Sequence, residues 1–185
     1  MLAWSYPIDK TSVLERIERS WASLDEATAG LSDERMRASG PDGWTVKDHL
    51  AHMAGWNLSL AALLERRHRQ AALALEGFST TDWDGQNEVM LRRHRALVPD
   101  EVRALLLGSR VMVLSALGGL SDADLMRPYM EYQPHDLRTS PPTSDDPVVR
   151  WIIGSIEDHV EEHLGYIGPL IAGGRQSPAV FPPTL

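Results

Sequence analysis

Apolar residues recur at helical spacing in long stretches of this chain, and no strand-period alternation persists long enough to compete with them. Written as ranges, the stretches are 10–30, 45–75, 87–117 and 148–171. Pro99 falls inside the third, which therefore reads either as one kinked helix or as two successive helices, 87–98 and 101–117. Thr45 followed by Asp48 is typical of a capping box at the start of the second. The pattern predicts an all-α fold, a four-helix bundle with a long connection before the last helix.

The length favours a single domain over residues 1–185. A chain of 185 residues with 43% hydrophobic content can bury a substantial core, which we expect to span about 8–172. Residues 121–147 are rich in Pro, Ser, Thr and Asp and read as a long irregular loop, of the kind that often covers a site. We expect residues 175–185 to form an irregular tail.

Charge and composition exclude several classes of function. The net charge of −8 and the pI near 5.3 argue against a nucleic-acid partner, which would need a concentrated basic surface. The chain has no cysteine, which excludes disulfides, thiolate metal ligands and a cysteine nucleophile. No stretch approaches the roughly 20 apolar residues of a membrane span, so we expect a cytoplasmic protein without a membrane partner.

Three histidines form a candidate metal site. His159 and His163 are one helical turn apart, and on a helical wheel they lie at the margin of the apolar arc of the last helix. His52 lies on the flank of the apolar arc of the second helix. Each histidine alone could be an ordinary boundary residue. Together they predict an open site with three protein ligands, provided that the two helices present them at the same depth.

The residues around these histidines leave further roles open. His49 points about 60° away from His52 on the wheel, which favours an outer or packing role over that of a fourth ligand. Trp56, one turn from His52, could line a ligand pocket or the core. We assign Trp44 to the core and Trp83 to a loop.

Glu162 belongs to a sequence that matches an inverted zinc-peptidase pattern, H-x-x-E-H. That pattern needs an acidic ligand farther along the chain, and no Asp or Glu follows Glu162. The peptidase hypothesis is therefore set aside. Glu162 remains a candidate outer-sphere base or a surface charge.

The segment from Trp44 to His52, with Trp56, resembles the second-helix signature of the DinB-like superfamily. In that family a tryptophan opens the helix and a histidine eight positions later binds a metal. His159 and His163 match the family's last-helix pair. The resemblance covers roughly residues 11–171 and is most specific at the two histidine segments.

The resemblance implies a bundle, frequently dimeric, that holds zinc, nickel or a similar divalent ion on His52, His159 and His163. Characterised relatives include transferases and isomerases that use bacillithiol, mycothiol or glutathione, and others hydrolyse or sequester reactive small molecules. A metal-poor branch that protects against electrophilic toxins has a similar Glu-His ending. The chain has no recognisable counterpart of the second domain of mycothiol-dependent isomerases.

We therefore expect a metal-dependent enzyme that acts on a small electrophile, by thiol transfer with a low-molecular-weight thiol as co-substrate. A divalent ion deprotonates a bound thiol and lowers the pKa of bound water toward about 7. Metal-hydroxide hydrolysis at the same site is the nearest enzymatic alternative. A bundle that binds or sequesters a ligand without metal or turnover is the alternative from another class. A homodimer and a small-molecule substrate are the expected partners.

Overall fold

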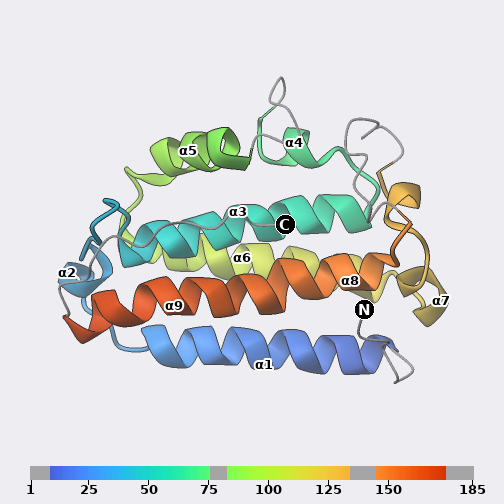
Figure 1. The fold of residues 1–185 in the computed structure, drawn as a ribbon, viewed down its shortest axis with the longest axis horizontal. Helices are drawn as coiled ribbons and strands as arrows, with labels where there is room; N and C mark the ends of the chain where they lie inside the picture. The colour runs from blue at the N-terminus through green and yellow to red at the C-terminus, as the bar shows by residue number, and fades with distance from the viewer. Residues whose placement is uncertain (1–8, 76–82, 134–144, 174–185) are drawn as a thin grey trace.

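The computed structural model describes residues 9–75, 83–133 and 145–173. It is all-α, as predicted, with no strand in these ranges. Four long rods run side by side (Figure 1). They are α1 (Lys10–Thr28), α3 (Val46–Leu64), α6 (Pro99–Gly118) and a last rod of α8 (Val148–Ile153), the π-helical segment η2 (Gly154–Asp158) and α9 (His159–Ala172). Shorter helices are α2 (Asp33–Met36), α4 (Arg69–Ala72), α5 (Trp83–His94), α7 (Asp122–Leu125) and the 3-10 turn η1 (Tyr129–Glu131). No described helix is long and apolar enough to cross a membrane.

Helix α3 is the central element of the bundle. It packs against α6 and against the last rod, and α4 and α5 cover its outer side (Figure 1). It begins with the predicted capping box, in which the Thr45 hydroxyl accepts from the Asp48 backbone N–H and the Asp48 carboxylate accepts from the Thr45 N–H. Because α3 has neighbours on several sides, most of its residues are buried, histidines included.

Helix α1 buries the face that its periodicity predicts. Val13, Ile17, Trp21 and Leu24 are buried, and Leu14 packs at the edge of the same core. This face lies against α8, η2 and α9. Helix α1 thereby supports the rod that carries His159 and His163 from the side away from α3.

The second helix ends earlier than predicted, at Leu64 rather than near residue 75. The Arg67 N–H donates to the Ala62 carbonyl at 2.7 Å and the Arg66 N–H to the Leu63 carbonyl at 2.8 Å, which is the hydrogen-bond pattern of a Schellman motif. Arg66 has a φ of 58°, a left-handed position usually taken by glycine. The chain reverses there and lays α4 against α3.

The third stretch forms two separate helices, α5 and α6. Proline 99 lies in the first turn of α6, where its missing N–H leaves no helical hydrogen bond unmade. Trp83, assigned to a loop from the sequence, instead begins α5. Helix α5 lies on the outer side of α3 and brings Trp83 close to Trp56.

The connection before the last rod is more ordered at its start than predicted. Within 121–133 the chain forms α7 and η1, and buries Leu125, Tyr129 and Tyr132. Its two ends are joined, because the Tyr129 N–H donates to the Asp146 carbonyl at 2.9 Å. Residues 134–144, and the tail expected at 175–185, lie outside the described residues.

Candidate metal centre

The three predicted histidines meet between α3 and α9. Nε2 of His159 lies 3.1 Å from Nε2 of His52 and 3.0 Å from Nε2 of His163. The three can each present a ring nitrogen within 4.8 Å of the others. His52 on α3 and the two histidines on α9 therefore lie at the same level along the bundle. A helical wheel does not contain this information.

This donor set fits a divalent transition metal. Two nitrogens that each lie about 2.0–2.1 Å from a tetrahedral zinc ion are about 3.3–3.4 Å apart, a few tenths of an ångström more than the separations found here. Burial lowers the pKa of His159 to about 4, and lowers the pKa of His52 and of His163 well below the usual value. The three rings are therefore neutral near pH 7, which is the form of imidazole that binds metals.

The π-helical segment η2 leads directly into His159. The His159 backbone N–H donates to the carbonyl of Gly154, five residues earlier, and the His159 side chain hydrogen-bonds to the backbone of Ser155. Because Nε2 faces the other histidines, Nδ1 is the ring nitrogen left to donate to Ser155. Such a bond from the outer nitrogen fixes the tautomer and orientation of a ligating ring.

His49 lies behind His163 and outside the group of three. Its Nδ1 is 2.9 Å from Nδ1 of His163, on the opposite side of that ring from His159. Burial lowers the pKa of His49 to about 4, so this ring is neutral and can accept a hydrogen bond from the Nδ1–H of His163. That bond leaves Nε2 of His163 without a proton and directed at the other two histidines.

Two tryptophans flank the histidines on α3. The Trp44 ring centroid lies 5.2 Å from that of His49 and 5.4 Å from that of His52. Trp44 is only half-buried, so its assignment to the core was wrong: it lies at the surface end of α3 and covers the histidines. The Trp56 ring lies 6.2 Å from that of His52 and is also half-buried.

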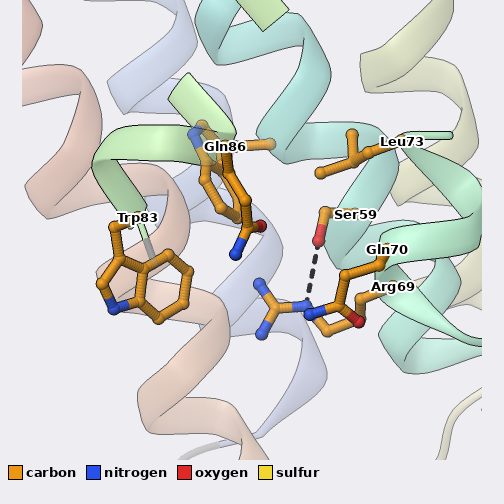
Figure 2. A pocket seen from close by; sticks show the side chains of 7 residues that line it. Ser59, Arg69, Gln70, Leu73, Trp83 and Gln86 are labelled. Carbon is orange, nitrogen blue, oxygen red and sulfur yellow. Dashed lines mark hydrogen bonds between the residues drawn. The ribbon is translucent and has the colours of Figure 1, made fainter. Parts of the chain in front are cut away.

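Trp56 also lines a pocket, whose other lining residues are labelled in Figure 2. Its cavity has a volume of about 10 Å³, which is room for about one water-sized group. The Trp83 ring lies 5.3 Å from that of Trp56 and forms one wall. The side chains that line the pocket are Trp56, Ser59, Arg69, Gln70, Leu73, Trp83 and Gln86. Sequence reasoning found only Trp56 among them. Ser59 is also on α3, but the others belong to α4, its C-cap residue Leu73 and α5, whose positions depend on the unpredicted turn at Arg66.

Glu162 is connected to the histidines through Tyr166. It is half-buried and accepts a hydrogen bond from the Tyr166 hydroxyl at 3.1 Å. The Tyr166 ring stacks on His49, with centroids 5.7 Å apart and an interplanar angle of 17°. Glu162 therefore contacts a residue that packs on the outer histidine.

Comparisons with known proteins agree with this arrangement. A crystal structure of a protein from Streptococcus pneumoniae has a similar fold, with a TM-score of 0.69 at 16% identity over 93% of this chain and 92% of that chain. A search of curated protein sequences gave no significant match. The profile of the DinB superfamily matches residues 16–167, which include all three histidines and nearly all of the bundle. The chain therefore belongs to the DinB superfamily.

Proposed function

We propose that the protein binds a divalent metal ion, zinc or nickel, through His52, His159 and His163, and uses it to transfer a small thiol to an electrophilic substrate. One observation carries the proposal: three neutral imidazoles from two helices, of which His52 and His163 are buried and His159 is half-buried, direct Nε2 atoms at one point. Imidazole nitrogen is a preferred ligand of both ions. Three protein ligands leave a coordination position for a co-substrate.

The chain's own residues set the limits of the chemistry. A bound divalent ion would supply a deprotonated thiol or hydroxide near neutral pH. The sulfur must come from a small molecule, because the sequence contains no cysteine. In the proposed transfer a bond forms between that sulfur and an electrophilic carbon, the leaving group departs with its electron pair, and the thiol proton passes to solvent. The expected homodimer and cytoplasmic location stay predictions.

Metal content and turnover of the purified protein test the proposal together. We expect about one zinc or nickel per chain by elemental analysis. The metal-loaded protein should accelerate the reaction of chlorodinitrobenzene with bacillithiol, mycothiol or glutathione, releasing chloride and the thioether. Dinitrophenol without added thiol would indicate hydrolysis at the same site. Absence of metal after loading, with no turnover, would favour the metal-free binding alternative and overturn the proposal.

Loss of His49, which lies outside the group of three, should weaken metal binding without abolishing it. His49→Ala removes the acceptor for Nδ1–H of His163, so that ring is no longer held in its ligating orientation. Metal affinity should fall about 10- to 100-fold, the usual effect of removing such a partner. Competition with a chromophoric chelator measures the change, and His68→Ala, an exposed histidine, is the control. An affinity equal to that of the unaltered protein would exclude this role for His49.

A further inference from the structure

Arg69 is a buried cation whose hydrogen bonds go to neutral groups. It is 8% exposed. Its Nε donates to the Ser59 hydroxyl at 2.9 Å and its Nη1 donates to the Tyr129 hydroxyl at 3.0 Å. No carboxylate among residues 9–75, 83–133 and 145–173 forms an ion pair with it. Its positive charge is therefore withdrawn from water without a counter-charge from the described part of the chain.

The other buried cations of the described residues differ in this respect. The Lys47 ammonium lies 2.9 Å from the Asp48 carboxylate, and the Arg110 guanidinium lies 2.8 Å from that of Asp25. Arg110 is a close match for Arg69, since it is 9% exposed and lies over a tryptophan ring. Burying a charge without a partner is costly, and the usual remedy is an opposite charge. Among the described residues no such charge lies at Arg69.

The surroundings of Arg69 hold its guanidinium at the pocket. Its central carbon lies 5.3 Å from the centroid of the Trp151 ring and 6.0 Å from that of Trp56. Figure 2 shows the end of the guanidinium facing the space between Trp83 and Gln86, with Gln70 beside it. An arginine has five N–H donors, of which the two hydroxyls take two. The structure thus presents an oriented cation to a pocket with aromatic walls.

The pocket and the three histidines lie along the same helix. Trp56 is one turn beyond His52 on α3, contacts the His52 ring and lines the pocket. Ser59, the partner of Arg69, lies seven residues beyond His52, a rise of roughly 10 Å along a helix. The separation of the histidines and Arg69 is therefore within the length of a molecule of ordinary metabolite size.

We propose that this pocket is the subsite for an oxyanion, a carboxylate or a phosphate, carried by a small molecule whose reacting end lies at the three histidines. The oxyanion pairs with Arg69, and the rest of the molecule lies outside this small cavity, against the half-buried rings of Trp56 and Trp83. The inference rests on the proposed function for the reaction at the histidines, while binding of the anion depends on Arg69 alone. It narrows the substrate or co-substrate to an organic anion.

Matched ligands of different charge test the subsite. Benzoate, phenyl phosphate and the neutral benzamide would be titrated by calorimetry into the metal-loaded protein and into its variants. We expect an anion to bind about 10- to 100-fold more tightly than benzamide, the usual gain from a charge-assisted hydrogen bond. Whichever of the two anions binds more tightly identifies the oxyanion class. Arg69→Gln should abolish the preference and keep the metal, and Arg69→Lys should retain part of it.

Two control variants separate this subsite from the metal and from general damage. His159→Ala should keep the preference for the anion, because the anion is held by Arg69 and not by a metal. Arg110→Gln, which alters an equally buried arginine that has its own carboxylate, should keep it too.

Equal affinities for the anions and benzamide in the unaltered protein would overturn the proposal, as would a preference that survives Arg69→Gln or vanishes in His159→Ala. If Arg69→Gln does not fold, the affinities of the unaltered protein, Arg69→Lys and His159→Ala for the anions and for benzamide test the proposal instead. A metal-free protein that still prefers the anion would refute the proposed function alone.

Discussion

Replacing His159 with alanine should remove stoichiometric metal from the protein. Its Nε2 is 3.0–3.1 Å from the Nε2 atoms of both other histidines, so it is the central member of the group. Without it two nitrogens remain, and they come from different helices. We expect affinity to fall more than about 100-fold, beyond the effect of losing an outer partner. Elemental analysis after dialysis against a weak chelator measures the loss, and thiol transfer should disappear with it.

Two further histidine variants, one in the proposed centre and one at the surface, serve as comparisons for His159→Ala. His52→Ala should have the same effect from the other helix, which would show that the ligands span α3 and α9. His68→Ala changes an exposed histidine and should leave metal content unchanged. A full metal complement in His159→Ala would mean that the ion is bound elsewhere, and the proposed centre would then be wrong.

Acid should destabilise the metal-free protein strongly. Burial lowers the pKa of His49 and His159 to about 4 and that of His52 and His163 well below the usual value. In the unfolded chain these rings take up protons near pH 6.5. Between about pH 6.5 and 4 the unfolded state binds more protons, so the free energy of unfolding falls as the pH falls. Each histidine contributes up to about 1.4 kcal/mol per pH unit, and typical domains have only about 5–15 kcal/mol in total.

Urea unfolding at pH 7.5, 6.5 and 5.5, with a chelator present, measures this dependence. Stability should be fully present above pH 6.5 and should fall by several kcal/mol by pH 5.5 if all four histidines contribute. His163→Gln should reduce the slope and His68→Ala should not. A free energy of unfolding that is constant over this range would show that the rings take up protons in the folded state at the same pH as in the unfolded chain.

Periodicity was sufficient to predict the elements whose buried faces decide the packing. The face of α1 and the start of α3 follow from apolar spacing and from the capping residues Thr45 and Asp48, which are local signals. The same logic placed His52, His159 and His163 toward the interior. Their convergence depends on how far α9 slides along α3, a tertiary quantity that a helical wheel does not contain.

Other features lacked a local signal. The turn after α3 uses Arg66, and the turn after α4 uses Ala74 with a φ of 50°, at positions where glycine is the usual marker. The π-helical segment η2 departs from the 100° step that a wheel assumes. The pocket at Arg69 follows from that first turn and from the packing of α5, so no spacing in the sequence could have indicated it.

The positions of the three histidines along the chain have a consequence for folding. His52 and His159 are 107 residues apart in sequence and adjacent in space. A metal ion bound to both would act as a cross-link of the folded state and would stabilise it by binding, in a protein that has no cysteine to form a disulfide. Metal capture would then come late in folding, after the final helix has docked, and would hold together the two halves of the molecule.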